Sequence, residues 1–396
     1  MKKNFKKGGK SASRKERITA FVLSLIDGLA RSVTKAKKPK RKSILVVKVD
    51  LLGDYILHRN FFEALKNHTE FIDHSITFCC NKAIRGLSEK LDTDVIDRWI
   101  SVPFPAFVKE PKKRLAAWSQ ILDTTYDLAI FPTASRSYFY DDLIAKNCRA
   151  LRKIGNQGNT HNHFPWQARQ SQGYFDQFAE MPQGLLFEFD LNKAFYENYL
   201  AKKLPYHFPT IQPLATKNKE FSIIISPGAS AAFRQWPVAM YVEVMRYLLE
   251  KKPVCQIQIT GSPAEKSIGL EIKSFFEEDP RVENICGKAP LKDLPDLLAS
   301  ADLLIANESG VIHLAKALGV GLIYCISNGN HYGRFNPYPE YQNEGLLRYF
   351  YPKAIRELKE KGDEDELKNR YYWGSREDIS TIKSKDLVAA LKEDLV

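Results

Sequence analysis

Three short polar turns hold the residues whose types and spacing suit phosphate chemistry: Gly53-Asp54, Gly228-Ala229-Ser230 and Asn307 to Gly310. Each turn follows an apolar run short enough for a buried strand and precedes a stretch with helical spacing. A helix that begins at the carboxyl end of a strand binds anions, because its first backbone N–H groups and its dipole point outward. Taken singly, each turn is also typical of an ordinary strand-to-helix connection capped by its own polar side chain.

The elements that would position these turns alternate between strand and helix, which predicts parallel sheets covered on both faces. In the first half, strands are expected at 44–49, 75–80, 95–102 and 127–131, and helices at 55–66, 82–90, 110–123, 138–147 and 187–200. In the second half, strands are expected at 222–226, 255–260, 282–285, 303–306 and 321–326, and helices at 236–250, 264–276, 291–299, 312–318, 353–370 and 384–395. Two such halves predict an α/β fold of two Rossmann-like domains facing a central cleft, which suits a nucleotide-linked substrate.

The chain is expected to divide into four parts: a basic, partly disordered tail at 1–42 with a short amphipathic helix, a first domain at 43–203, a linker at 204–220 and a second domain at 221–396. Prolines mark the linker. The last helix is a candidate to pack back on the first domain. Residues 155–175, rich in Gly, Asn, Gln and His, are interpreted as a long loop of the kind that often carries function.

Neither half contains GxGxxG or GxxxxGK[ST]. Their absence weakens a dinucleotide oxidoreductase and a P-loop kinase or ATPase. No DxD-type acidic pair lies in a strand-end turn, so no metal site is expected. The six cysteines have no zinc-like spacing and are expected to be buried free thiols in a reducing cytoplasm.

The net charge of +12 belongs to the tail. Residues 1–42 hold 15 Lys/Arg and only two acids, Glu16 and Asp27, whereas the rest of the chain holds 44 Lys/Arg and 45 Asp/Glu. Because the body is close to neutral, nucleic acid is not an expected partner. No stretch reaches the ~20 apolar residues of a transmembrane helix.

Within the tail, basic residues flank an apolar helical face made by Ile18, Phe21, Val22, Leu25 and Leu29. Such a segment can lie on an anionic membrane surface. The alternative is a flexible solubilising tail whose short helix docks on its own domain. The first interpretation predicts a cytoplasmic protein that is peripheral at the inner face of the cytoplasmic membrane.

Four motifs occur in a fixed order between roughly residues 43 and 340. They are Leu52-Gly53-Asp54 after a strand, Ser226 to Ser230 with Arg234-Gln235-Trp236-Pro237, Thr260 to Glu265, and Asn307-Glu308-Ser309-Gly310 with His313. In this order they resemble glycosyltransferase family 9, the heptosyltransferases of lipopolysaccharide core synthesis. The resemblance implies a GT-B fold with an N-terminal acceptor domain and a C-terminal donor domain. It also implies inverting transfer from a nucleotide sugar, with no metal and no other cofactor.

On the acceptor side, the resemblance gives Asp54 the role of general base and places Gly53 beside it. The chemistry fits, because an acceptor hydroxyl must lose its proton as it attacks the anomeric carbon, and a carboxylate at a cleft-facing turn can take that proton. The structural alternative is that Asp54 only caps the helix that follows it.

On the donor side, the resemblance implies seven binding residues: Gly228, Ser230, Arg234, Glu265, Ser309, Gly310 and His313. Arg234, where the family commonly has Lys, would hold the donor diphosphate as a planar fork and stabilise charge on the leaving nucleotide. Glu265 would accept hydrogen bonds from the donor ribose. Ser230 and the turn at Gly228 would cradle phosphate, as would the helix start at Ser309. For Arg234, Glu265 and His313 the alternatives are a surface arginine, a first-turn helix acid and a structural histidine.

Two features depart from the family pattern. Glu308 stands where Asp is usual, and the polar segment 327–335 replaces a Gly-Pro turn. These departures leave the donor sugar open. The sequence therefore predicts transfer of heptose or a related sugar onto lipopolysaccharide or another cell-surface glycan or glycolipid. The alternatives are a transferase of another sugar onto a capsule or protein glycan, and a non-catalytic nucleotide-sugar-binding protein.

Overall fold

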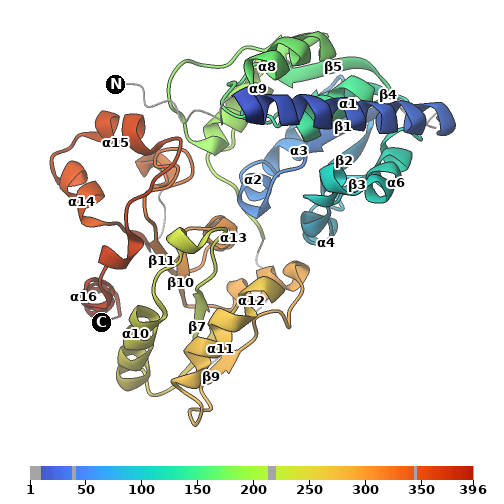
Figure 1. Cartoon of the computed structure of the whole chain (residues 1–396). Coiled ribbons are helices and arrows are strands. Elements are labelled where there is room, and N and C mark those ends of the chain that lie inside the picture. The colour runs from blue at the N-terminus through green and yellow to red at the C-terminus, as the bar shows by residue number, and fades with distance from the viewer. Residues whose placement is uncertain (1–9, 38–41, 213–219, 343–345, 396) are drawn as a thin grey trace. The chain divides into compact units, whose positions relative to one another are not determined.

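The computed structural model describes residues 10–37, 42–212, 220–342 and 346–395. The chain forms two compact units, and each contains one six-stranded sheet (Figure 1). The first unit comprises Met1–Leu51, His58–Pro182 and Leu191–Pro205, and the second comprises Leu52–Leu57, Gln183–Asp190 and Tyr206–Val396. Parts of the predicted tail and linker, at 1–9, 38–41 and 213–219, lie outside the described residues.

The sheet of the first unit is parallel throughout and has the strand order β3-β2-β1-β4-β5-β6. Its central strand β1 is buried at every position, because helices cover both faces of a parallel sheet. The continuous apolar run of β1 fits burial on both faces. The strands are β1 Ser43–Lys48, β2 Ser75–Asn81, β3 Arg98–Val102, β4 Tyr126–Phe131, β5 Ala150–Asn156 and β6 Gln177–Ala179.

The helices of the first unit occupy the connections between these strands. They are α1 Lys10–Val33, α3 Asn60–Lys66, α4 Lys82–Leu91, α5 Ala106–Lys109, α6 Pro111–Ile121, a π-helical turn η1 Tyr138–Asp142, α7 Leu143–Asn147, α8 Pro165–Ser171 and the 3₁₀ turn η2 Gln172–Tyr174. Helix α9, Glu188–Leu200, begins in the second unit and continues in the first.

The sheet of the second unit is also parallel, in the order β12-β11-β10-β7-β8-β9. Its strands are β7 Phe221–Ser226, β8 Cys255–Ile259, β9 Val282–Asn284, β10 Leu303–Asn307, β11 Leu322–Ile326 and β12 Leu346–Phe350. Its helices are α2 Leu52–Ile56, α10 Val238–Lys251, α11 Lys266–Ser274, α12 Leu294–Ala299, α13 Gly310–Leu318, α14 Lys353–Glu360, α15 Glu364–Tyr371 and α16 Ser384–Asp394. Short 3₁₀ turns lie at Ala232–Arg234, Pro263–Glu265, Leu291–Asp293, Glu340–Gln342 and Ile379–Thr381.

Both sheets have the Rossmann strand order, with the chain reversing direction between the first and fourth strands of each set. In such sheets the crevice for a ligand lies at the carboxyl ends of those two strands. The relevant pairs are β1 with β4, and β7 with β10. The predicted α/β fold of two Rossmann-like halves is confirmed, and all six cysteines are buried and free, as expected.

Several predicted elements differ in extent. The helix predicted at 55–66 is two helices, because the chain turns at 57–59 and lets α2 pack against α13 while α3 carries Phe62 against Phe78 of β2. The charged helix predicted at 353–370 is broken at Gly362, whose φ is +71°. The sequence did not predict β5, β6 and β12, and the loop predicted at 155–175 is largely α8 and its flanking turns.

The unit boundaries also differ from the predicted domain boundaries. Helix α2 and residues 183–190 group with the second unit, although both lie within the predicted first domain. The last helix, α16, packs against α10 and buries Leu387 and Leu391 in the core of the second sheet. It therefore completes the core of the second unit, and its predicted packing back on the first domain stays a prediction.

The tail helix is longer and better anchored than the sequence suggested. Helix α1 has 24 residues and packs against α6 of the first unit. Its Asp27, 1% exposed, binds the fully buried Arg114 through two contacts of 2.6 and 2.7 Å. The indole of Trp118 donates a third hydrogen bond to the same carboxylate, at 2.5 Å. A buried charge pair thus joins the helix to the body.

Replacing Asp27 by Ala is expected to destabilise the first unit by about 3–5 kcal/mol, because Arg114 would keep a buried charge without its partner. Urea unfolding, together with the rate of tryptic cleavage within α1, measures the effect. Glu89→Ala is the matched control, since its 2.7 Å pair with Arg85 has side chains 40% and 41% exposed; exposed pairs contribute at most about 1 kcal/mol. Equal effects of the two substitutions would contradict an anchoring role for Asp27.

Candidate active site

The candidate site begins where β7 and β10 end, at the reversal point of the second sheet. Asn307, the last residue of β10, is fully buried and bridges the two strand ends. Its Nδ2 donates to the carbonyl oxygen of Pro227 at 2.5 Å, and its Oδ1 accepts from the backbone N–H of Trp236 at 3.2 Å. This side chain fixes the turn after β7 against the turn after β10, so the residues of both turns keep a defined spacing.

Arg234 connects the same two turns through its guanidinium. Its Nη1 donates to Ser230 Oγ at 2.9 Å, and its Nη2 lies 3.0 Å from both the carbonyl oxygen and Oε1 of Glu308. The Arg234 side chain is only 15% exposed. Residues from two separate motifs are therefore neighbours: Ser230 and Arg234 from one, and Glu308 from the other.

Glu308, the residue that departs from the family pattern, is the counter-charge of Arg234. Its Oε2 accepts from Ser327 Oγ at 2.9 Å. Burial raises the pKa of the Glu308 carboxyl, while Arg234 and the hydrogen bond from Ser327 lower it by less, so the net shift is upward. The added methylene relative to Asp gives Glu308 the reach to contact Arg234 and Ser327 together.

Two buried donors near this pair have no hydrogen-bond partner among the described residues: Arg234 Nε and Ser309 Oγ. Ser309 is the N-cap of α13, and Gly310 is the first residue of that helix. The first N–H groups of a helix have no acceptor within the helix itself. Side-chain donors and helix N–H groups therefore gather at one point of the second unit, which is the arrangement that binds an anion.

Glu265 and Gly228 lie directly against each other. A Cβ on Gly228 would fall 1.7 Å from Glu265 Oε1, so any larger residue here would displace this carboxylate from its observed position. Glu265 Oε2 accepts from the backbone N–H of Ser262 at 2.5 Å, which forms a capping box at the turn preceding α11. Glu265 therefore does cap the start of a helix, as its structural alternative proposes. Its other oxygen, Oε1, faces the turn after β7.

Gly53 and Gly310 allow α2 and α13 to approach closely within the second unit. A Cβ on Gly310 would lie 2.7 Å from the Gly53 nitrogen, and a Cβ on Gly53 would lie 2.8 Å from His313 Cδ2. The Nδ1 of His313 contacts Tyr338 Oη at 2.9 Å. Burial lowers the pKa of His313 to about 4, so its imidazole is neutral at pH 7. His313 therefore supports the helix pair as a buried neutral group, which matches its structural alternative.

Asp54, in the first turn of α2, lies in the field of a buried arginine that the sequence did not single out as a site residue. Arg334 donates from Nε to Glu188 Oε2 at 2.9 Å, and its Nη2 is 2.9 Å from the same oxygen. Burial lowers the pKa of Arg334, but the carboxylates of Glu188 and Asp54 raise it by more. Asp54 and Arg334 therefore lie close enough for their opposite charges to attract each other.

The structure thus groups the predicted residues in two sets of the second unit. Around the β7 and β10 ends lie Gly228, Ser230, Arg234, Glu265, Ser309 and Gly310. Around the α2–α13 contact lie Gly53, Asp54, Gly310 and His313. Sequence reasoning missed Arg334 and Glu188, and it read Asn307 only as a turn residue. Arg334 falls within the polar segment 327–335, and the polarity of that segment was the sequence feature that could have indicated a site residue there.

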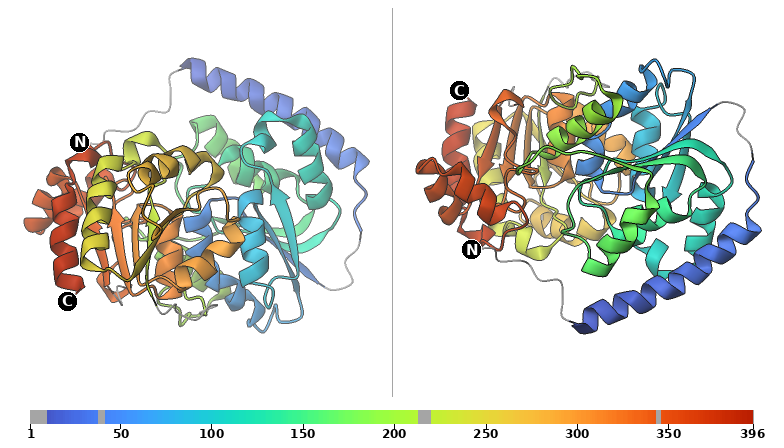
Figure 2. Two further views of the ribbon diagram at one scale, coloured as in Figure 1. Left: turned by 90° about the horizontal axis from the view of Figure 1, so that it is seen from below. Right: turned by 90° about the horizontal axis from the view of Figure 1, so that it is seen from above.

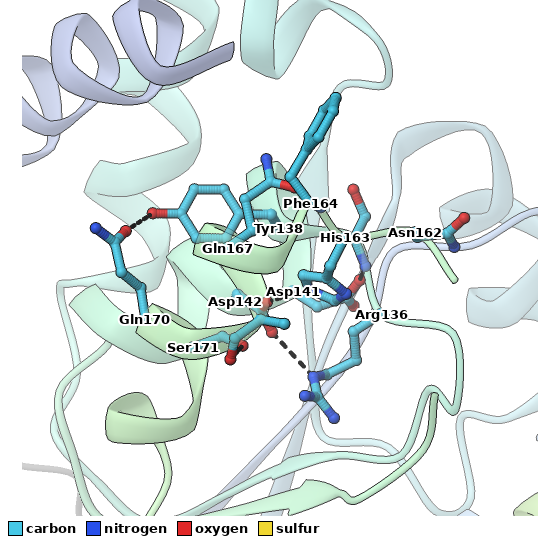
Figure 3. Close-up of polar contacts among 12 residues, drawn as sticks. Arg136, Tyr138, Asp141, Asp142, Asn162, His163, Phe164, Gln167, Gln170 and Ser171 are labelled. Carbon is cyan, nitrogen blue, oxygen red and sulfur yellow. Dashed lines mark hydrogen bonds and ion pairs between the residues drawn. The ribbon is translucent and has the colours of Figure 1, made fainter. Parts of the chain in front are cut away.

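A second polar cluster lies in the first unit, around the π-helical turn η1 (Figure 3). The fully buried Asp142 accepts from Arg136 Nε at 2.9 Å and contacts His163 Nε2 at 2.6 Å. Burial, together with Asp50, raises the pKa of the neighbouring Asp141 to about 8. The cluster fastens the segment before α8 to η1, and π-helical turns are frequent at functional sites.

The described residues contain neither a cluster that could hold a metal ion nor a helix that could span a membrane. Among them, no group of three or more His, Cys, Asp or Glu side chains lies close enough to hold a metal ion. No helix in the described ranges is both long enough and apolar enough to cross a bilayer.

Comparison with known proteins shows what this chain resembles in sequence and in fold. Residues 159–347 match the model of glycosyltransferase family 9 (heptosyltransferase). Lipooligosaccharide heptosyltransferase 2 of Campylobacter jejuni is 30% identical over 116 residues, which cover 28% of this chain and 36% of that protein. The match to lipooligosaccharide heptosyltransferase 2 of Haemophilus influenzae is 29% identical over 100 residues. The matched segments span about a third of these relatives, 36% and 28% of their lengths.

Solved structures match over far more of the chain. Escherichia coli heptosyltransferase WaaC with ADP superimposes with a TM-score of 0.65 at 13% identity, covering 89% of this chain and 99% of that one. Escherichia coli ADP-heptose lipopolysaccharide heptosyltransferase II gives a TM-score of 0.64 at 15% identity, with 89% and 98% covered. At this identity the similarity establishes the fold, which is of the GT-B type.

The architecture therefore indicates a fold of the GT-B type. Residues 159–347, just under half of the chain, resemble glycosyltransferase family 9 (heptosyltransferase), which agrees with the resemblance found in the sequence motifs.

Proposed function

We propose that this protein is an inverting glycosyltransferase that moves heptose or a related sugar from a nucleoside-diphosphate donor to lipopolysaccharide or another cell-surface glycan or glycolipid. One observation carries the proposal: the unpartnered donors Arg234 Nε and Ser309 Oγ lie at the N-terminus of α13, where β7 and β10 end. The names of the relatives, lipooligosaccharide heptosyltransferases, support heptose as the sugar and a lipooligosaccharide as the acceptor.

Donor binding rests on charge and on directed donors. The diphosphate carries negative charge that grows as the sugar leaves, and fixed donors aimed at that charge stabilise the transition state. Arg234 supplies a cation, while Ser309 and the first N–H groups of α13 supply neutral donors. Glu265, beside Gly228, offers a carboxylate to the hydroxyls of the donor ribose. In this account the pair with Glu308 holds Arg234 in place before the donor arrives.

The transfer step is a single displacement. The acceptor hydroxyl oxygen forms a bond to the anomeric carbon while the bond from that carbon to the diphosphate oxygen breaks. The hydroxyl proton passes to the carboxylate of Asp54, and the electron pair of the broken bond stays on the diphosphate. The cation of Arg334 lies within electrostatic reach of Asp54 and attracts the carboxylate that takes the proton. Attack opposite the leaving group inverts the anomeric configuration.

We further propose that the leaving diphosphate needs no metal ion. Arg234 and the N-terminal end of α13 supply the positive charge that a divalent cation supplies in other transferases. Activity in the presence of EDTA tests this part of the proposal, and loss of transfer that is restored by Mg²⁺ or Mn²⁺ would contradict it.

The pair between Arg234 and Glu308 also supports one alternative, a nucleotide-sugar-binding protein without transferase activity. Glu308 cancels part of the charge that a leaving diphosphate needs, and the 3.0 Å contact is buried. Such a protein would bind the donor but release no nucleoside diphosphate in the presence of any acceptor. A transferase acting with another sugar on a capsule or protein glycan would release it with a different donor.

The experiment that tests the proposed function is an acceptor-dependent transfer assay. Purified protein is incubated with a panel of nucleotide sugars and with truncated lipooligosaccharide acceptors, and the products are identified by mass spectrometry. The proposal expects one donor to add a single sugar with inverted anomeric configuration. Donor hydrolysis or binding without any transfer, across the panel, would favour the non-catalytic alternative. We also propose a cytoplasmic location with peripheral association at the membrane where a glycolipid acceptor resides.

A further inference from the structure

Helix α1 has its polar and apolar faces arranged opposite to those of an ordinary surface helix. Its inner face carries the salt bridge between Asp27 and Arg114. The buried side chains of Leu23 and Ala30 lie on the same face. Its outer face carries six large apolar side chains that are between 48% and 68% exposed: Ile18, Phe21, Val22, Leu25, Leu29 and Val33. The spacing of these residues puts them on one side of a single helix.

The outer face is held in a fixed direction by contacts along the helix. Near its start, Gln167 of α8 donates to Glu16 at 2.8 Å, and the guanidinium of Arg17 lies 4.9 Å from the ring of Trp166. In the middle, Leu23 packs against Tyr138 and Leu143. In both views of Figure 2, α1 lies along the outside of the first unit. The apolar side cannot turn inward without breaking these contacts.

The charges around the apolar face are of one sign. The exposed ionisable side chains described between 13 and 37 are basic: Arg14, Lys15, Arg17, Arg31, Lys35 and Lys37. Both acidic side chains of the helix have partners on the body of the first unit. Glu16 accepts a hydrogen bond from Gln167, and Asp27 forms a salt bridge with Arg114. Residues 1–42 as a whole hold 15 Lys/Arg against these two acids. The occupant of this face is therefore expected to be apolar inside and negatively charged at its border.

We propose that the outer face of α1 is a lipid-docking surface that binds an anionic bilayer. An amphipathic helix with a basic border lies in the plane of such a bilayer and sinks its apolar side chains below the phosphate groups. A second copy of this chain fits less well, because two such faces would bring like charges together. The inference deepens the proposed function and rests on it in one respect: membrane docking would bring the enzyme to its acceptor only if that acceptor is a glycolipid.

The contacts of α1 add a consequence for orientation. Because Asp27, Glu16 and Leu23 tie the helix to α6, α8 and η1, docking would set the direction of the whole first unit relative to the bilayer. A flexible tethering tail would bring the protein to the membrane without setting that direction.

Vesicle co-sedimentation of the full chain tests the proposal. The probe is a vesicle of phosphatidylglycerol and phosphatidylethanolamine, compared with one of phosphatidylcholine alone. The variant F21S/L25S removes two outer-face side chains that are 65% and 60% exposed. The matched control is L270S/F275S, two exposed apolar residues of the second unit that are 54% and 51% exposed. Circular dichroism verifies that both variants fold.

The wild type and the control are expected to bind the anionic vesicles, and F21S/L25S is expected to bind at least about tenfold more weakly. Equal binding by F21S/L25S and the wild type would overturn the proposal, because basic residues alone would then explain the attraction. A wild-type dimer that F21S/L25S converts to a monomer in analytical ultracentrifugation would also overturn it, since a second copy would be the occupant.

The vesicle result is independent of catalysis. Transfer to a water-soluble acceptor fragment by F21S/L25S at the wild-type rate separates the two claims. If the wild type binds vesicles but transfers no sugar, the proposed function fails and the docking surface stands. If it transfers sugar but F21S/L25S binds vesicles as well as the wild type does, the docking surface fails and the function stands.

Discussion

Asp54→Asn is expected to lower the rate of sugar transfer by about 10²- to 10⁴-fold, the usual contribution of a positioned general base. The amide has nearly the shape of the carboxylate but cannot take the proton of the acceptor hydroxyl. Asp54 lies in the first turn of α2, which packs on α13 through the close approach of Gly53 and Gly310. Because the substitution leaves that contact intact, donor binding is expected to be unchanged.

Steady-state kinetics with the identified donor, together with calorimetric titration of the nucleoside diphosphate, measures both effects. Asp94→Asn, at an exposed position of the first unit, is the matched control and should change neither. A small loss with Asp54→Asn, within a few-fold of the wild-type rate, would mean that another group takes the proton. An equal loss of donor binding would mean that Asp54 acts by holding α2 and not as a base.

The second large effect concerns Arg234. Replacing Arg234 by Gln is expected to lower kcat by about 10²- to 10³-fold, the range found when one donor to a developing anion is removed. The guanidinium contacts Ser230 and Glu308 at 2.9 and 3.0 Å, so it links both turns of the proposed donor site. Its loss also leaves the buried Glu308 carboxyl without its cation, which can destabilise the unit on its own.

The design separates these two consequences. In R234Q/E308Q neither side chain is charged, so stability should recover while kcat stays low. In E308Q alone, Arg234 keeps its charge and loses its internal partner, so donor binding should be equal to or tighter than that of the wild type. Arg234→Lys keeps the charge without the planar fork and should retain part of the activity. Recovery of kcat in R234Q/E308Q would contradict a role for Arg234 on the diphosphate.

The parts of the fold that the sequence predicted are those with a local signature. The continuous apolar runs of β1, β10 and β11 are buried at every position, as expected for parallel strands that are covered on both faces of the sheet. Strand β5 was missed because it carries Arg152 and Lys153, and its Leu151 is 71% exposed, so neither an apolar run nor a clean alternation marks it. The break between α2 and α3 was missed because neither Gly nor Pro lies at 57–59.

The residues of the candidate site also fall into those that the sequence could predict and those that it could not. The helix start at Ser309-Gly310 and the turn at Gly228 were predictable, because small residues between a strand and a helix have a local pattern. The pairing of Arg334 with Glu188 was not, since the two residues are 146 positions apart and neither stands in a motif. The outward direction of the apolar face of α1 was equally hidden, because only the burial of Asp27 against Arg114 decides which side faces the body.

The most direct test of the central claim is a calorimetric titration of the wild-type protein with a panel of nucleoside diphosphates, each in the presence and absence of EDTA. We predict that one nucleoside diphosphate binds with the same affinity in both conditions, and that R234Q/E308Q binds it far more weakly. A thermal-shift measurement supports the titration, because a ligand at 100 times its Kd stabilises a folded protein by about 2.7 kcal/mol. Failure of every nucleoside diphosphate to bind, or binding only when a divalent metal is present, would contradict the metal-free donor site at Arg234 and α13.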